Sequence, residues 1–288
     1  MLRLPRAHQS DRAFASHPTT ARCRYFDGID TEPVGLSPSR TTLFKSCAQL
    51  FKYRVIDKLP EPQDVPSARG ILVHEVLHQL LQLGEMERTF DKAAELLDDV
   101  WKVLRADAEF EGFEVDEQAM MLDCIVLLRN YFDVEDPTKV RPHELEWWIE
   151  HASDTLALRG IVDRVEIDED GDWIISDYKT GRPPSLDYSL GAFFGLKFYA
   201  LVCWRNLGRL PKQLRLIHLQ SSGGSRGPEV LTLVPTEQML LGLERQLEAV
   251  ADAIRRATIS EDWRPRPGRQ CEWCPHKPIC PAFSARTD

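Results

Sequence analysis

The sequence predicts a single mixed α/β domain, and three changes of pattern along the chain support this. Between residues 37 and 137, apolar side chains recur every three or four positions, the spacing of amphipathic helices. From residue 144, apolar and polar residues alternate as they do in strands, and helical spacing returns further on. Near the C-terminus three cysteines lie within ten residues. We therefore expect a helical N-terminal half, a sheet with flanking helices, and a Cys-rich C-terminal cluster.

The boundaries of the ordered domain follow from the N-terminal composition. Residues 1–35 are polar, contain scattered arginines and show no periodicity, so they are predicted to be a disordered tail or an over-extended start site. Ser37 followed by Pro38 is typical of a helix start, with a capping hydroxyl and an early proline. Residues 36–288 are therefore predicted to form one domain.

The individual elements follow from the same periodicities. Helices are expected over residues 38–51, 67–84, 90–108, 116–133, 188–206 and 236–257. Strands are expected over residues 144–151, 155–168, 172–178, 213–220 and 228–234. Prolines 60, 62 and 66 mark the connector between the first two helices.

The overall composition excludes several classes of protein. The 288 residues are 43% hydrophobic and 9% aromatic, which excludes a collagen, a coiled coil or a wholly disordered chain. No apolar run reaches about 18 residues, so no membrane span is expected, and no apolar segment follows the first arginines as in a secretory signal. We therefore expect a cytoplasmic protein. The net charge of −9 is unusual for a nucleic-acid-binding protein, although it does not exclude a local basic groove.

A charged hairpin carries the first chemical signal. Residues 168–171 (D-E-D-G) favour a tight turn, and counting outward from it sets Asp163 opposite Asp177. Lys179 lies two residues beyond Asp177, so both side chains leave the same face of the strand. Two carboxylates suit Mg²⁺ or Mn²⁺, and a lysine beside them can orient water and stabilise phosphoryl charge. Spacing alone leaves open a solvated hairpin with an exposed ion pair.

A second signal lies on the helix predicted over residues 67–84. His74, Glu75 and His78 fit the H-E-x-x-H pattern, in which two histidines hold zinc while the glutamate activates water. That pattern is short and has no third ligand in a recognisable context here. The alternative is that His74 alone points inward as a ligand, while Glu75 and His78 are ordinary helix residues.

The cysteines give the third signal. An odd total of seven, without a secretory signal, does not indicate a disulfide framework. Cys271, Cys274 and Cys280 have the C-x₂-C-x₅-C spacing of a soft-metal site in a reducing compartment. The fourth ligand is left open between His276, for zinc, and Cys47, for an iron–sulfur cluster.

Two further cysteines, Cys124 and Cys203, lie among apolar residues and are expected to be plain core residues.

Taken together, these motifs resemble the RecB-like branch of the PD-(D/E)XK nuclease superfamily. The matching pieces are residues 36–39 through Cys47, Gly70-x₃-His74, Gly160-x₂-Asp163-Arg164, residues 177–181 (D-Y-K-T-G) and the terminal cysteines. Their order and spacing match from residue 36 to residue 284. The cysteine arrangement is similar to that of AddB-type nuclease domains and CRISPR-associated RecB-like exonucleases. The resemblance implies a restriction-endonuclease-like mixed central sheet flanked by helices.

The resemblance also implies roles for individual residues. His74, Asp163 and Asp177 would bind one or two Mg²⁺ or Mn²⁺ ions, helped by the backbone carbonyl of Tyr178, while Lys179 would position the attacking water. Only the first histidine of H-E-x-x-H would then be used. The resemblance further implies a structural [4Fe–4S] cluster, which four cysteines would hold: Cys47, Cys271, Cys274 and Cys280.

The expected function is a metal-dependent DNA exonuclease that prefers single strands and acts in DNA repair or recombination, with any unwinding supplied by a helicase or repair partner. Arg40, Arg182 and Tyr199 are candidate DNA contacts. Gly195 stands where many relatives have the glutamine of a Q-x₃-Y motif. The alternative is therefore a nuclease-like module that binds DNA or a partner without cutting; a zinc peptidase is the third reading.

Overall fold

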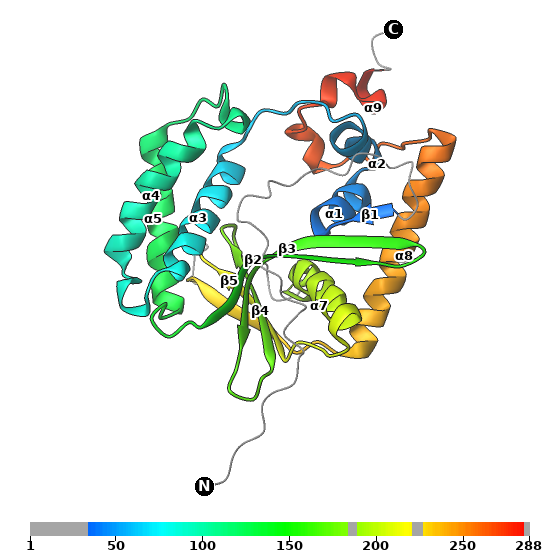
Figure 1. Ribbon diagram of the computed structural model, residues 1–288. Coiled ribbons are helices and arrows are strands. Elements are labelled where there is room, and N and C mark those ends of the chain that lie inside the picture. Colours follow the sequence, from blue (N-terminus) through cyan, green and yellow to red (C-terminus); the bar gives the residue numbers. More distant parts are fainter. Residues whose placement is uncertain (1–33, 184–188, 221–226, 285–288) are drawn as a thin grey trace.

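Helices cover both faces of a mixed six-stranded sheet (Figure 1). The computed structural model describes residues 34–183, 189–220 and 227–284. The helices of the N-terminal half are α1 (Pro38–Ser46), α2 (Ala48–Phe51), α3 (Val65–Gln82), α4 (Phe90–Arg105) and α5 (Glu117–Val134). The later helices are α6 (Ser189–Ala192), α7 (Phe194–Leu207), α8 (Glu237–Ser260) and α9 (Pro281–Ser284). The mixed α/β class with a helical first half is confirmed.

The sheet has the order β1-β3-β4-β5-β6, with β2 paired to the other edge of β3. Its strands are β1 (Val34–Leu36), β2 (Pro142–Ala152), β3 (Leu156–Ile167), β4 (Trp173–Lys179), β5 (Gln213–His218) and β6 (Glu229–Leu233). The start of β3 pairs in parallel with β1, whereas its end pairs antiparallel with β4. Between these two stretches lie residues 159–163, so the sheet forks there.

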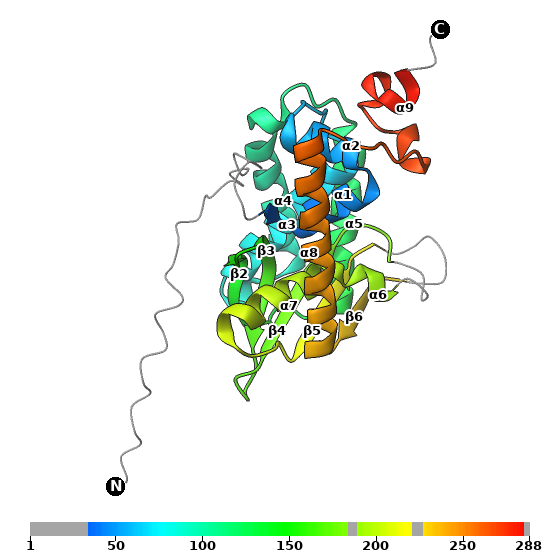
Figure 2. The ribbon, with the colours of Figure 1, turned by 90° about the vertical axis from the view of Figure 1, so that its right-hand side faces the viewer.

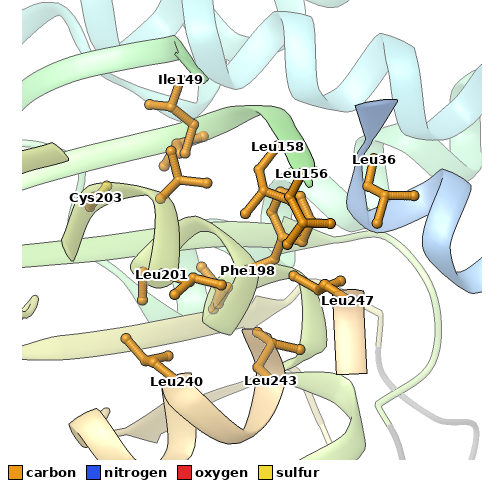
Figure 3. Packing of buried hydrophobic residues seen from close by; sticks show 14 of the residues in the cluster. Leu36, Ile149, Leu156, Leu158, Phe198, Leu201, Cys203, Leu240, Leu243 and Leu247 are labelled. Atoms are coloured by element: carbon orange, nitrogen blue, oxygen red, sulfur yellow. The ribbon is translucent and has the colours of Figure 1, made fainter. Parts of the chain in front are cut away.

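Two apolar cores hold the layers together. On one face of the sheet, helices α3, α4 and α5 pack against Tyr178 of β4, Ile217 of β5 and Leu219, which follows β5. On the other face, α7 lies between the sheet and the long helix α8, which runs along the outside of the molecule (Figure 2). Phe198 of α7 illustrates this core, since it lies between strand residues and the leucines of α8 (Figure 3). The fork of the sheet therefore lies between two packed layers of helices.

The structure differs from the sequence prediction at the first strand and at Cys47. Val34 and Gly35, predicted to belong to the disordered tail, begin strand β1, which pairs with Leu156–Leu158. A strand of three residues shows no periodicity, so its partner could not be foreseen. The helix expected over residues 38–51 is interrupted at Cys47, whose extended backbone (φ −162°, ψ 112°) separates α1 from α2. Residues 1–33, the rest of the predicted tail, lie outside the described part of the chain.

Within the described residues, no helix combines the length and the apolar character that crossing a bilayer requires.

Candidate active site

The hairpin between β3 and β4 has the register that the sequence predicts. Arg164 pairs with Ser176 and Ile167 with Trp173, so the same count sets Asp163 opposite Asp177. At that point the strands separate, and the Tyr178 N–H donates to Asp163 Oδ2 at 2.7 Å. At the fork, the Asp163 carboxylate thus takes the place of the backbone carbonyl that would accept this bond in a continuous ladder. The bond also fixes the position of the Asp163 side chain.

Helix α3 brings His74 to this fork. His74 Nδ1 lies 3.4 Å from Asp163 Oδ2, and its Nε2 lies 3.1 Å from the Tyr178 carbonyl oxygen. Adjacent ligands of an octahedral Mg²⁺ are about 3 Å apart, given metal–oxygen distances of about 2.1 Å. The spacing of the His74 ring and the Tyr178 carbonyl therefore fits two neighbouring ligands of one ion.

Strand β2 adds Glu146, a residue that the sequence analysis missed. Ligand atoms of His74, Glu146 and Asp163 all lie within 4.8 Å of one another. Leu145 and Trp147 pair with the residues on either side of Asp163, so Glu146 lies opposite it, with a left-handed backbone (φ 48°). The signal was a glutamate within an alternating strand, and only the register of β2 against β3 shows where that glutamate points.

The electrostatics of this group favour a bound cation. Burial, followed by repulsion from Asp177, raises the pKa of Asp163. Desolvation of its carboxyl group and repulsion from Asp163, Glu75 and Asp177 raise the pKa of Glu146 to about 8. The raised pKa values show that these neighbouring carboxylates repel one another when both are ionised. A divalent ion bound between them would stabilise the ionised form of both.

Asp177 and Lys179 form an ion pair on the same face of β4. Burial lowers the pKa of the Lys179 ammonium, but attraction to Asp177 and then Asp163 outweighs it, so the pKa is raised overall. Lys179 therefore remains an ammonium. It can donate hydrogen bonds and stabilise negative charge, and it is not a proton acceptor in this state.

The two histidines of H-E-x-x-H do not converge. His74 faces Asp163, whereas His78 Nε2 lies 2.8 Å from the side-chain amide of Gln82 on the same helix. Glu75 Oε1 accepts from Gln79 at 2.7 Å. His74 therefore belongs to the group at the fork, and a zinc site formed by both histidines has no support in this geometry.

A buried arginine supports the site from behind. The Arg164 side chain is fully buried and donates two hydrogen bonds to Glu135, at 2.7 and 2.8 Å, just beyond α5. It also donates to the Tyr178 hydroxyl at 2.7 Å. This network ties both strands of the fork to the helical layer.

A large cleft opens in front of Asp177 and Lys179. Arg40 and Tyr199, two of the predicted DNA contacts, line it, whereas Arg182 is exposed after β4 and is not among the described lining residues. Gly160 lies so close under the Tyr199 ring that an added Cβ would be 2.4 Å from Cε1. The glycine of the G-x₂-D-R motif thus lets an aromatic ring approach β3.

The lining of the cleft also includes Gly195, where an added Cβ would meet its nearest neighbour, Pro38, at an ordinary 3.9 Å. Gly195 and Tyr199 are four residues apart on α7 and so share a face. The cleft therefore has room for a side chain at this position.

The four cysteines predicted to bind a cluster meet at a second cavity. Its lining includes Cys47, Cys271, Cys274 and Cys280. Because the chain is extended at Cys47, α1 ends there, and the backbone N–H of Arg266 lies 3.5 Å from Cys47 Sγ as a donor. The Tyr53 hydroxyl donates to the Ile279 carbonyl at 3.0 Å, which joins the first helices to the C-terminal segment.

The position of His276 bears on the alternative of a zinc site at these cysteines. A tetrahedral zinc ion holds its sulfur ligands about 3.8 Å apart, from Zn–S bonds of about 2.3 Å. Among the described residues, no three cysteine sulfurs lie within 4.8 Å of one another. His276, the alternative zinc ligand, instead places Nε2 2.7 Å from Glu61 and packs on Tyr53. His276 is also not among the described residues that line the cysteine cavity, so this geometry does not support it as a zinc ligand.

Cys124 and Cys203 are buried, as expected of core cysteines, and burial raises the pKa of each thiol to about 12.

Fold and site together define an α/β protein with an acidic centre at the fork of its sheet. The chain belongs to the PD-(D/E)XK nuclease superfamily, whose family model matches residues 35–281. A crystal structure from Eubacterium rectale, provisionally described as an exonuclease, is similar with a TM-score of 0.55 at 12% identity over 88% of each chain. SSO0001 gives a TM-score of 0.37 at 14% identity over 89% of each chain. Among curated protein sequences, none matches this chain.

Proposed function

We propose that this protein is a metal-dependent DNA exonuclease that prefers single strands. The observation that supports the proposal most is the convergence of His74, Asp163 and Glu146 beside the Asp177–Lys179 pair, at the end of a cleft. Nucleases of this superfamily use divalent metals, and carboxylate, imidazole and carbonyl ligands suit Mg²⁺ or Mn²⁺.

The roles of the residues follow from their positions. His74, Asp163, Asp177 and the Tyr178 carbonyl would hold the ion, with Glu146 as an additional ligand. The bound ion would lower the pKa of a water ligand and polarise the phosphoryl oxygen. The Lys179 ammonium would donate to the attacking water and to the phosphoryl oxygens, where negative charge increases during attack. Asp177 would keep that ammonium directed at the phosphate, because the two side chains are paired.

The cysteine cavity supports a second part of the proposal, a [4Fe–4S] cluster on Cys47, Cys271, Cys274 and Cys280. The cluster would be structural, because hydrolysis needs no electron transfer. It would join the C-terminal segment to the first helices, which form one side of the cleft. A DNA repair role, with a helicase or repair partner to supply single strands, belongs to this proposal as well.

The test is a cleavage assay in Mn²⁺ on end-labelled linear and circular oligonucleotides, single- and double-stranded, with anaerobically purified protein. We expect linear single strands to be degraded from an end and circular single strands to persist. Lys179→Ala should reduce the rate by at least about 100-fold, whereas Arg264→Ala, an exposed residue paired with Asp262, is the matched control. Undiminished activity in Lys179→Ala would contradict the site assignment.

A binding module that does not cut is the second candidate, favoured by the empty space at Gly195. Tight binding of single strands without any cleavage in Mg²⁺ or Mn²⁺ would select it.

A further inference from the structure

Trp148 is a large aromatic residue that the fold leaves accessible. Its side chain keeps 38% of its surface exposed and lines the same cleft as Asp177 and Lys179. Its neighbour Trp147 points to the opposite face of β2 and packs against Trp173, with ring centroids 5.8 Å apart. The exposure of Trp148 is therefore specific to the cleft face of the strand.

The register of β2 and β3 sets the distance from Trp148 to the catalytic group. Trp148 pairs with Ile161, and Asp163 is two residues further along β3. Two residues of a strand span about 6.7 Å, comparable to the length of one nucleotide in an extended single strand. On the far side, Arg159 and Glu150 form an ion pair 3.7 Å apart. Along β2 and β3, the acidic group, the Trp148 indole and the charged pair therefore follow one another in this order.

We propose that Trp148 is the stacking platform for the base adjacent to the scissile phosphate of single-stranded DNA. This deepens the proposed function, because it names the subsite that would select single strands. An unpaired base can lie flat on the indole while its phosphate reaches the acidic group one step away, and such stacking tolerates any base. A base within a duplex is paired and stacked, so it cannot offer its face to Trp148.

The proposal is tested by binding, which does not require cleavage. The anisotropy of a labelled single-stranded oligonucleotide is measured in EDTA with wild type, Trp148→Ala and Trp148→Phe, after melting curves have shown that each variant is folded. We expect Trp148→Ala to raise the Kd about 10-fold, with Trp148→Phe within about 3-fold of wild type. Leu122→Ala, an exposed apolar residue on α5 outside the cleft lining, is the control.

An abasic residue then separates stacking from general packing. It is moved one position at a time along the oligonucleotide, and one position should weaken wild-type binding about as much as Trp148→Ala does. In Trp148→Ala, the same abasic position should not raise the Kd any further. The proposal would be overturned if the abasic position and Trp148→Ala weakened binding additively. It would also be overturned if Trp148→Ala left the Kd unchanged, or if wild type did not bind single strands.

The outcome separates this inference from the proposed activity. If Trp148→Ala binds like wild type while both cleave in Mn²⁺, the stacking role is wrong and the nuclease stands. If binding depends on Trp148 but wild type cleaves nothing, the platform stands and the nuclease activity is wrong.

Discussion

The site at the fork and the cysteine cavity differ in how the fold supports them. The fork is assembled from α3, β2, β3 and β4, and the buried Arg164–Glu135 network lies directly behind it. The cysteine segment contains the short helical turns Arg269–Glu272, Lys277–Ile279 and α9, in which no residue is buried, and only His276 between the first two turns is buried. The first site is therefore organised by the core, whereas the second has little apolar burial of its own to order it.

The two sites also differ in the chemistry of their candidate metal ligands. Carboxylates and a histidine at the fork suit a hard ion that exchanges with solvent, and thiolates suit a soft metal that stays bound. Metal bound to the folded state alone adds its binding energy to folding. We infer that the cysteine segment would depend on a bound metal for order, whereas the fork would need its ion for activity alone. The following predictions test that division.

The largest effect should come from Asp163→Ala compared with Cys47→Ser. Asp163→Ala removes a buried carboxylate of the acidic group, so cleavage should fall by about 1,000-fold or more while the absorbance near 400 nm, expected of thiolate-bound iron, is retained. Cys47→Ser should lose that absorbance, and the C-terminal segment should become sensitive to protease. Loss of the absorbance in Asp163→Ala would contradict the division between the two sites.

Metal removal tests the same division without mutation. EDTA should abolish cleavage while leaving hydrogen exchange in α3 and β4 almost unchanged, because the core holds the fork. Destruction of the cluster by oxidation should accelerate exchange selectively within residues 265–284. Mass spectrometry of exchanged peptides measures both, and a general increase of exchange throughout α3 and β4 in EDTA would show that the fork also needs its ion for order.

Glu146→Gln should have an intermediate effect. The amide keeps the shape of the side chain but removes a negative charge from the acidic group, so the Mn²⁺ concentration for half-maximal activity should rise about 10-fold. Saturating Mn²⁺ should restore much of the rate. Glu150→Gln, on the same strand and paired with Arg159, is the matched control. An unchanged metal requirement would show that Glu146 is not a ligand.

Gly195→Gln should have a smaller effect, in the opposite direction. The position faces the cleft with room for a side chain, and glutamine would restore the Q-x₃-Y pattern one helical turn before Tyr199. Replacing glycine near the start of α7 also favours the helix by about 0.5–1 kcal/mol. We expect the KM for a single-stranded substrate to fall about 3-fold with kcat little changed, and Gly195→Ala separates the helix effect from the amide. A higher KM would show that the glycine is needed.

Much of this architecture was predictable from local patterns, and the exceptions have physical reasons. The hairpin at residues 168–171 determines a short antiparallel pairing, so the opposition of Asp163 and Asp177 could be counted along the chain. Glu146 could not be placed in this way, although β2 and β3 pair in unbroken register from Glu144 to Ala152. The turn at residues 153–155 contains no glycine, so the sequence does not mark a centre from which to count. The cysteine spacing was recognisable because three ligands are local.

The direction of His276 could not be predicted either. A histidine among cysteines is a natural zinc ligand, but its ring is buried against Tyr53 and reaches Glu61, which also accepts from Arg54 at 2.6 Å. These partners are more than two hundred residues away in the chain, so only tertiary packing brings them together. Long-range contacts of this kind lie beyond periodicity and spacing.

The smallest effect that the structure predicts is a pH dependence of stability in the metal-free protein. Desolvation and neighbouring carboxylates raise the pKa of Glu146 from 4.5 to about 8. A raised carboxyl pKa means that the folded state binds the proton more tightly than the unfolded chain. Its contribution to stability is then full below about pH 4.5 and is lost as the pH rises toward about 8.

In EDTA, the Tm should therefore decrease slightly across this range, because Glu146 is an exposed residue and solvent screens part of the repulsion. The Tm of Glu146→Gln should decrease less, because its side chain carries no titrating proton. Glu150→Gln should behave like wild type. Adding Mn²⁺ should raise the Tm most at the upper end, where the carboxylates are ionised and bind the ion. An equal slope in wild type and Glu146→Gln would show that repulsion at the fork does not reach Glu146, and the acidic centre would then reduce to His74, Asp163 and Asp177.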